Sequence, residues 1–267
     1  MNLRETAYAK INLALHVRRR REDGYHELET LFAFVDAGDT LVAEPCGRDE
    51  LRVTGAFAGA LDAPFDNIVA RALAILPHGP GWAVTLDKAL PVAAGLGGGS
   101  ADAGAVFRLV RDAHGLPDDW LARAARLGAD VPACVESRAC IGRGTGTELE
   151  GVVNDLVGAA VLLVNPRVPL ATAPVFRGWD GVDRGPLTGA TVREMAVSGR
   201  NDLEPPALAL VPQIARVLGV LETTGAWLVR MSGSGATCFA LYETAQARDE
   251  ACAAMPQEWW TLTGRLR

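Results

Sequence analysis

The segment from Pro91 to Asp102 constrains the fold of this chain more than any other part of its sequence. It reads Pro-Val-Ala-Ala-Gly-Leu-Gly-Gly-Gly-Ser-Ala-Asp, and four glycines within five positions leave the backbone uncovered by side chains. Apolar residues with the spacing of one helical face follow at Ala103, Val106, Phe107 and Val110. We therefore expect a glycine loop that leads into a helix, with Ser100 as the N-cap of that helix.

A glycine loop before a helix predicts an anion site, because free backbone N–H groups and the helix dipole both attract negative charge. The loop has no lysine after its glycines, as a Walker loop requires, and Ser100 stands where the dinucleotide-binding fingerprint needs its third glycine. The His-Arg-Asp and Asp-Phe-Gly signatures of protein kinases are absent. A glycine-rich turn without a ligand is the alternative, and phosphate is the ligand we expect.

Composition sets the class of protein. The 267 residues, 49% of them hydrophobic, are enough for one large domain or two modest ones. A net charge of −6 disfavours nucleic-acid binding, and the longest apolar run, 156–164, is too short to cross a membrane. The five cysteines show no zinc spacing, the histidines show no metal spacing, and the N-terminus lacks a signal-peptide core. We expect a soluble cytoplasmic enzyme that binds neither nucleic acid nor a membrane.

Hydrophobic periodicity predicts strands and helices along the whole chain. In the first half we expect strands at 7–17, 25–35, 41–43, 51–53 and 82–86, a charged hairpin tip at 18–24, and helices at 66–76 and 118–127. In the second half we expect a strand at 152–165, a loop at 177–189, a helix at 206–223 that Pro212 divides, strands at 226–231 and 236–242, and a closing helix and strand. We place a domain boundary near residue 150, with domains at 1–150 and 151–267.

Lys10 and Asp130 each allow a structural and a chemical interpretation. Lys10 lies within an apolar strand, where it could extend to solvent at a sheet edge or hold a fixed charge beside a phosphoryl group. Asp130 precedes Val131-Pro132, where it could cap a helix or accept the proton of a substrate hydroxyl. Neither residue decides the function by itself.

Several motifs, in this order along the chain, resemble those of the GHMP kinases, the family of galactokinase, homoserine kinase and mevalonate kinase. Beside the glycine loop they are Ala9-Lys10-Ile11-Asn12-Leu13, Asp23-Gly24-Tyr25-His26-Glu27-Leu28, Asp66-Asn67, Gly128-Ala129-Asp130-Val131-Pro132, Asn201-Asp202-Leu203-Glu204 and Ser232-Gly233-Ser234-Gly235-Ala236-Thr237. The similarity runs nearly end to end. The Asp-Gly-Tyr-His motif is similar to that of the branch whose acceptor is diphosphocytidyl methylerythritol.

The resemblance implies an α+β fold of two domains, the N-terminal one like a ribosomal-protein domain and the C-terminal one ferredoxin-like, with the active site in the cleft between them. It implies that Lys10 and Asp130 are the catalytic pair, with Asp130 taking the proton of the C2 hydroxyl. It also implies that Asn67 lies near the adenine of ATP. The residues that would hold ATP are Pro91, Val92, Ala93, Ala94, Gly95, Leu96, Gly97, Gly98, Gly99, Ser100, Ala101 and Asp102.

On the substrate side, the resemblance implies that Tyr25 stacks on the cytosine and that His26 forms a hydrogen bond with it. Phe176 would close the other side of the cytosine, and Asn12 would also contact the substrate. A hairpin shoulder that packs for structural reasons is the alternative for Tyr25 and His26.

The implied reaction transfers the γ-phosphoryl group of ATP to the C2 hydroxyl, in the methylerythritol phosphate route to isoprenoids. Mg²⁺ is implied because the charge of ATP must be neutralised; the sequence does not identify its protein ligand, and Ser100 is one candidate. Another GHMP small-molecule kinase, of the homoserine or mevalonate type, and a non-catalytic nucleotide-binding regulator are the alternatives. An RNA-binding module is a third one, which the acidic charge disfavours. We expect a monomer or a weak homodimer.

Overall fold

The computed structural model describes residues 2–60 and 67–267, which form two compact units. The first unit consists of Met1–Lys10, Ala37–Val92 and Gly97–Ser137, and the second of Ile11–Asp36, Ala93–Leu96 and Arg138–Arg267. Both units are discontinuous in sequence because strands β1 (Leu3–Arg20) and β2 (His26–Pro45) each contribute to both. The domain boundary near residue 150 stays a prediction.

The strands of the first unit follow the expected pattern with one correction. Strand β4 (Trp82–Asp87) pairs with β2 in the antiparallel direction and with β3 (Glu50–Thr54) in the parallel direction. The predicted short strand at 41–43 is not a separate element, because it continues β2 and pairs with β4. The strand predicted at 7–17 is confirmed within β1, which begins earlier and ends later.

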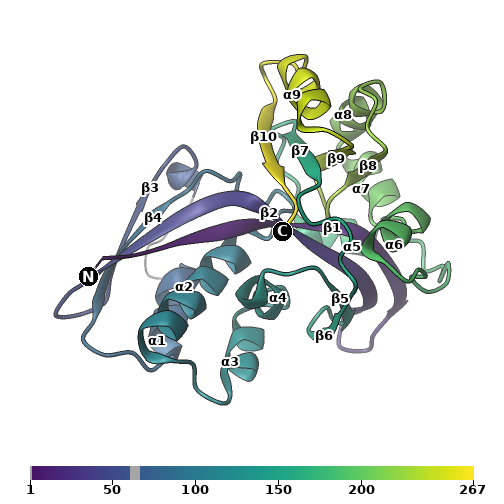
Figure 1. Ribbon diagram of the computed structural model, residues 1–267. Coiled ribbons are helices and arrows are strands. Elements are labelled where there is room, and N and C mark those ends of the chain that lie inside the picture. The colour runs from purple at the N-terminus through teal and green to yellow at the C-terminus, as the bar shows by residue number, and fades with distance from the viewer. Residues whose placement is uncertain (1, 61–66) are drawn as a thin grey trace. The chain divides into compact units, whose positions relative to one another are not determined.

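The helices of the first unit gather on one side of its strands (Figure 1). They are α1 (Ile68–Ile75), α2 (Gly98–His114), α3 (Trp120–Leu127) and α4 (Val131–Glu136), and a 3-10 turn at Ala58–Ala60 precedes them. The helices predicted at 66–76 and 118–127 are confirmed as α1 and α3, although Asp66 lies outside the described residues. The N-cap of α1 is Asn67, whose side chain accepts a hydrogen bond of 2.9 Å from the backbone N–H of Val69. None of the described helices has both the length and the apolar character that a membrane crossing requires.

Helix α2 begins at Gly98, three residues earlier than an N-cap at Ser100 predicts. Its N-cap is Gly97, with a left-handed φ of 61°, and the prediction that Ser100 caps this helix was wrong. Glycine adopts this backbone conformation without a steric cost, so the chain enters the helix directly from the loop. The Gly97 carbonyl accepts a hydrogen bond of 2.7 Å from the N–H of Ala101. From Ala101 to Val110 every residue of α2 is buried, which makes it the central helix of this unit.

The second unit holds, in the described residues, a four-stranded antiparallel sheet in the order β10-β7-β9-β8. The strands are β7 (Ala160–Asn165), β8 (Leu228–Met231), β9 (Cys238–Tyr242) and β10 (Trp260–Arg265), and the sheet packs against α8 (Gln213–Glu222) and α9 (Ala245–Ala253). This β-α-β-β-α-β order is that of a ferredoxin-like domain, as expected.

The other elements of the second unit are the hairpin of β5 (Cys140–Gly144) and β6 (Glu148–Gly151) and the short helices α5 (Thr172–Arg177), α6 (Val192–Ser198) and α7 (Glu204–Leu210). The predicted division of the helix at Pro212 and the loop at 177–189 are confirmed. The strand expected from residue 152 starts at Ala160, because Asn154 forms a turn with Leu156 and Gly158 takes a φ of 84°.

Gly104 allows α2 and α4 to touch. A Cβ at this position would lie 2.6 Å from the backbone carbon and oxygen of Cys134, which cannot yield as a flexible side chain can. We expect Gly104→Ala to lower the free energy of unfolding by about 1–3 kcal/mol through overpacking. Gly219→Ala, in α8, is the matched control: a Cβ there meets nothing within 4 Å, and the change should stabilise by about 0.5–1 kcal/mol. Urea unfolding of both variants tests this, and equal effects would contradict the packing argument.

Candidate active site

Lys10 and Asp130 form an ion pair in the first unit, with 3.0 Å between Nζ and Oδ2. Lys10 is 4% exposed, so the interpretation of a lysine that extends to solvent at a sheet edge was wrong. Asp130 occupies the N-cap position of α4, but its side chain makes no capping hydrogen bond. Its carboxylate instead faces Lys10 and is one-third exposed, which leaves it accessible to a substrate hydroxyl.

The ion pair lies against the first turn of α2. A Cβ on Gly97 would stand 2.9 Å from Cε of Lys10 and 3.7 Å from Oδ2 of Asp130. The first N–H groups of a helix have no partner within it, and here they begin at Gly98, the residue that follows Gly97. Backbone donors and one buried cation thus converge on a site that suits a phosphoryl group.

Lys88, Asp39 and Asp102 form a buried cluster that holds the start of α2. Lys88 Nζ lies 2.5 Å from Asp39 Oδ2 and 2.7 Å from Asp102 Oδ2. Asp39 Oδ1 accepts hydrogen bonds from the backbone N–H groups of Ala89 and Leu90, at 2.6 and 2.8 Å. The Asp102 carboxylate therefore anchors the helix through Lys88. Sequence analysis missed Lys88 and Asp39, since a lysine after a strand carries no sign that it is buried.

Burial and mutual charge set the protonation of this cluster. Burial opposes the charge of Lys88, but the carboxylates of Asp102 and Asp39 outweigh it and raise the pKa of Lys88. Burial, together with the charge of Asp39, raises the pKa of Asp102 to about 8 against the opposing effect of Lys88. The cluster therefore carries no surplus of positive charge, and Lys10 supplies the cation at the proposed phosphoryl site.

Residues Ala93–Leu96 of the glycine loop belong to the second unit, where the turn at Ser232–Gly235 supports them. Ser232 Oγ donates a hydrogen bond of 2.8 Å to the Gly95 carbonyl. A Cβ on Gly95, whose φ is 76°, would lie 2.4 Å from the carbonyl oxygen of Ser232. The loop conformation therefore requires glycine at this position, and the Ser-Gly-Ser-Gly motif acts as its support.

Asn12 is buried in the second unit with its polar atoms engaged. Its side chain donates a hydrogen bond of 2.7 Å to Thr30 Oγ1, and its backbone N–H donates one of 3.2 Å to Ser232 Oγ. Thr30 Oγ1 in turn donates to the Ala14 carbonyl at 2.8 Å. The structure thus ties Asn12 into the framework next to the Ser232 turn, and its contact with substrate stays a prediction.

His26, Phe176 and Trp179 form an aromatic cluster, with ring centroids 5.1 Å apart for His26 and Phe176 and 5.8 Å apart for His26 and Trp179. Tyr25, next to His26 in the chain, is 63% exposed, so it does not pack as the structural interpretation of a hairpin shoulder would require. Sequence analysis missed Trp179 because it falls in a segment rich in glycine and aspartate.

The hydrogen bond between Arg20 and His26 defines the state of the His26 ring. Arg20 Nε donates to His26 Nε2 at 3.4 Å, so Nε2 is the acceptor and the proton resides on Nδ1. Burial and the nearby charge of Arg20 both lower the pKa of His26. His26 is therefore neutral at neutral pH and offers an N–H donor.

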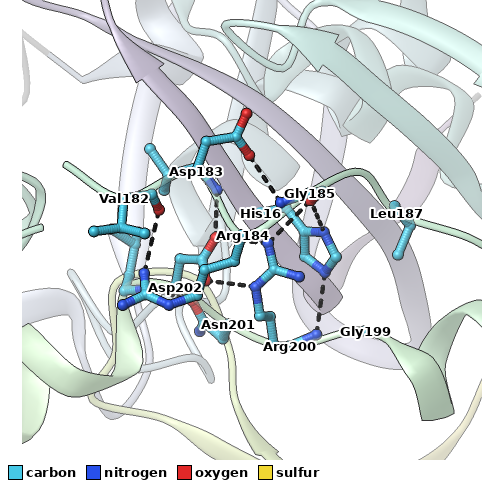
Figure 2. A network of polar contacts seen from close by, with 12 residues as sticks. His16, Val182, Asp183, Arg184, Gly185, Leu187, Gly199, Arg200, Asn201 and Asp202 are labelled. Atoms are coloured by element: carbon cyan, nitrogen blue, oxygen red, sulfur yellow. Dashed lines mark hydrogen bonds and ion pairs between the residues drawn. The ribbon is translucent and has the colours of Figure 1, made fainter. Parts of the chain in front are cut away.

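His16 fastens the segment that follows Trp179. Figure 2 shows its ring between the Gly185 carbonyl, 3.2 Å from Nδ1, and the backbone N–H of Arg200, 3.2 Å from Nε2. The Arg200 side chain also donates to the Gly185 carbonyl at 3.0 Å and pairs with Asp202 at 2.7 Å. Because Nε2 accepts, this network requires the neutral ring.

Metal ligands are sparse around these groups. The described residues contain no group of three or more His, Cys, Asp and Glu side chains that could hold a metal ion. Mg²⁺ bound to nucleotide phosphates takes one or two protein oxygens, so it does not require such a group. Ser100 lies in the first turn of α2, so its hydroxyl is at the N-terminal end of the helix, where the phosphates are expected.

Comparison with known proteins gives a consistent result. The model of the GHMP kinases N terminal domain matches residues 67–138, and that of the GHMP kinases C terminal matches residues 187–261. A 4-diphosphocytidyl-2-C-methyl-D-erythritol kinase of Novosphingobium aromaticivorans is 76% identical and covers 100% of this chain and 94% of its own. One of Erythrobacter litoralis is 63% identical and covers 98% of this chain and 99% of its own.

Solved structures agree with the sequence matches. A crystal structure of 4-(cytidine 5'-diphospho)-2C-methyl-D-erythritol kinase has a TM-score of 0.84 at 32% identity and covers 99% of each chain. The homoserine kinase of Cytophaga hutchinsonii has a TM-score of 0.73 at 17% identity, covers 99% of this chain and 95% of its own, and shares the fold. The expected GHMP fold class is thereby confirmed.

The His16 network predicts a pH-dependent stability. Burial, and then the charge of Arg200, lower the pKa of His16, while the Gly185 carbonyl, Asp202 and Glu29 act in the opposite direction. The folded protein therefore binds this proton less readily than the unfolded chain, whose histidine has a pKa of about 6.5. Neutral His16 makes its full contribution to the free energy of unfolding above about pH 6.5. This contribution is lost as the pH falls from there through the lowered pKa of the folded state.

We expect His16→Asn to be less stable than the wild type at about pH 7.5, with a difference that shrinks towards about pH 5. The variant keeps an N–H donor for Gly185 but does not titrate. Urea unfolding of both proteins across this range measures the difference, and the lowered pKa of His26 cancels because both proteins contain it. A difference that is constant with pH would contradict the assignment.

Proposed function

Because the chain belongs to the GHMP kinase family, within its branch of 4-diphosphocytidyl-2-C-methyl-D-erythritol kinases, we propose that it phosphorylates the C2 hydroxyl of 4-diphosphocytidyl-2-C-methyl-D-erythritol. ATP supplies the γ-phosphoryl group, and the products are the 2-phosphate and ADP. This reaction is a step of the methylerythritol phosphate pathway to isoprenoids.

One observation carries the proposal for the chemistry: the ion pair of the buried Lys10 and the partly exposed Asp130 lies against the first turn of α2, which has no side-chain cap. Phosphoryl transfer depends on positioning and on stabilisation of the charge that spreads over the transferred group. The backbone N–H groups at the start of α2 hold phosphate oxygens, and the Lys10 ammonium stabilises the charge that develops next to them.

Asp130 is the general base. It takes the proton of the acceptor hydroxyl as that oxygen attacks the γ-phosphorus, and the bond to the β-phosphate oxygen breaks to release ADP. Lys10, at 3.0 Å from Asp130 Oδ2, holds the carboxylate in place and directs it at the hydroxyl. The exposure of one-third of the Asp130 side chain leaves room for this proton transfer.

The cytidyl group binds through Tyr25, His26 and Phe176. The exposed Tyr25 ring offers an open face on which a base can stack, and Phe176 borders His26. The neutral His26 ring donates from Nδ1 to an acceptor on the pyrimidine edge of the base. In this proposal Asn67 contacts the adenine. The position of Asn67 as N-cap of α1 supports this role, because the next residue, Ile68, lies near Gly99 of the glycine loop.

Mg²⁺ is part of the proposal, since it neutralises the phosphate charge of bound ATP when present. Ser100 is the residue that we assign to it. The cytoplasm is the proposed location, because the five cysteines are scattered along the sequence with no Cys-x-x-Cys pair, a pattern that fits a reducing compartment. We propose a monomer or a weak homodimer whose ligands are ATP and the sugar alcohol.

Replacement of the base should abolish turnover without loss of nucleotide binding. We expect Asp130→Asn to lower kcat by about 10²–10⁴-fold and to leave the Kd of ATP within about threefold, because the amide cannot accept the proton. ADP release by both proteins, with Mg²⁺ and the cytidyl substrate, measures the effect. Undiminished turnover by Asp130→Asn would remove Asp130 from the mechanism.

Stacking of the cytosine on Tyr25 should strengthen binding of the cytidyl substrate. We expect Tyr25→Ala to raise KM for the cytidyl substrate about 5–150-fold with little change in kcat, since stacking of one base contributes about 1–3 kcal/mol. Val182→Ala, another exposed residue of the second unit, is the control. If methylerythritol without the cytidyl group reacts as well as the full substrate, the Tyr25–His26 site is wrong and a generic GHMP kinase remains.

A further inference from the structure

Arg108 is a buried cation in the middle of α2, about 15 Å along the helix from its first turn. One of its terminal nitrogens donates hydrogen bonds to the Cys134 carbonyl at 2.5 Å and to Ser137 Oγ at 2.9 Å. The other donates to the Thr6 carbonyl at 2.6 Å. A single side chain of α2 thus reaches both α4 and β1.

The contacts with α4 are at its C-terminal end. Cys134 belongs to the last turn of α4, whose carbonyl groups lack partners within the helix, and a cation is favoured at that end of the helix dipole. Ser137, in a left-handed conformation, is the C-cap residue of α4. Arg108 therefore caps the helix that Asp130 begins.

Arg108 also contacts β1, the strand that carries Lys10. Arg108 Nε lies 3.2 Å from Glu5 Oε1, an ion-pair distance, and the guanidinium carbon lies 5.3 Å from the centre of the Tyr8 ring. Side chains two residues apart lie on the same face of a strand, which places Tyr8 and Lys10 on one face of β1. The guanidinium group is therefore held against the strand that presents Lys10.

Helix α4 is held to β1 at two points, one at each of its ends. At its start the Lys10 ammonium meets the Asp130 carboxylate, and at its end Arg108 joins the Cys134 carbonyl to the Thr6 carbonyl. A helix of six residues is too short to be stable without tertiary contacts, so these contacts set its direction. The distance between Lys10 and Asp130 depends on that direction.

We propose that Arg108 is a positioning residue for phosphoryl transfer: it fixes the C-terminal end of α4 against β1, so that Asp130 stands opposite Lys10. This inference rests on the proposed roles of Lys10 and Asp130 in catalysis. Arg108 itself touches neither of them in the contacts described above. It acts on the rate of the chemical step, and the start of α2 is held separately by Lys88, Asp39 and Asp102.

The test compares Arg108→Met and Arg108→Lys with Arg123→Met. Arg123 is the matched control: it is a half-buried arginine of α3 in the same unit and also donates to a backbone carbonyl, that of Ile75. We expect Arg108→Met to lower kcat at least tenfold with the Kd of ATP and the KM of the cytidyl substrate changed less than threefold. Arg108→Lys, which keeps the charge, should recover part of this loss, and Arg123→Met should keep the wild-type kcat.

A double-mutant cycle separates positioning from loss of structure. In single-turnover measurements, Arg108→Met should cost less than twofold in an Asp130→Asn background, because Asp130 is already disabled. Equal losses in both backgrounds, or an unchanged kcat in both Arg108 variants, would overturn the inference. If Arg108→Met does not fold, as judged by circular dichroism, Arg108→Lys replaces it in the same cycle. Wild-type turnover by Asp130→Asn would instead contradict the proposed function and leave the packing of Arg108 unaffected.

Discussion

The first turn of α2 is the constraint on which the first unit depends. Gly97 turns the chain in a left-handed conformation. Any other residue at this position would add a Cβ only 2.9 Å from Cε of Lys10. A side chain there would displace Lys10 from Asp130. The same glycine that leaves the backbone N–H groups open at the proposed phosphate site therefore also makes room for Lys10, and both features depend on one residue.

Charge is distributed so that this turn attracts an anion without a surplus of buried cations. Lys88 lies close to the start of α2, but the cluster that it forms with Asp39 and Asp102 carries no surplus of positive charge and serves to hold the helix. At the proposed site, attraction for a phosphate comes from the start of the helix and from Lys10, whose own partner, Asp130, stays partly exposed. The Lys88 cluster is buried throughout, whereas the Asp130 carboxylate is partly exposed, and this difference fits a structural role for the cluster and the proposed chemical role for Lys10 and Asp130.

The sequence predicts the elements that have a strong period and misses those that depend on tertiary contacts. Alternation in β1, the glycine loop and the break at Pro212 are local signals, and the structure confirms them. The cap at Ser100 was wrong because a left-handed glycine can begin a helix without a capping side chain. Trp179 and Lys88 carry no local signal, since their burial depends on residues far away in the chain.

Helix α4 shows why the site itself was harder to predict than the fold. Asp130 begins a helix of six residues that has no period of its own to recognise, and the contacts that hold it come from α2 and β1. Gly104 lets α2 approach its backbone, and Arg108 caps its last turn. The position of Asp130, the proposed base, therefore depends on Gly104 and Arg108, which contact α4 away from Asp130. In the sequence these two residues show no feature other than that of packing residues.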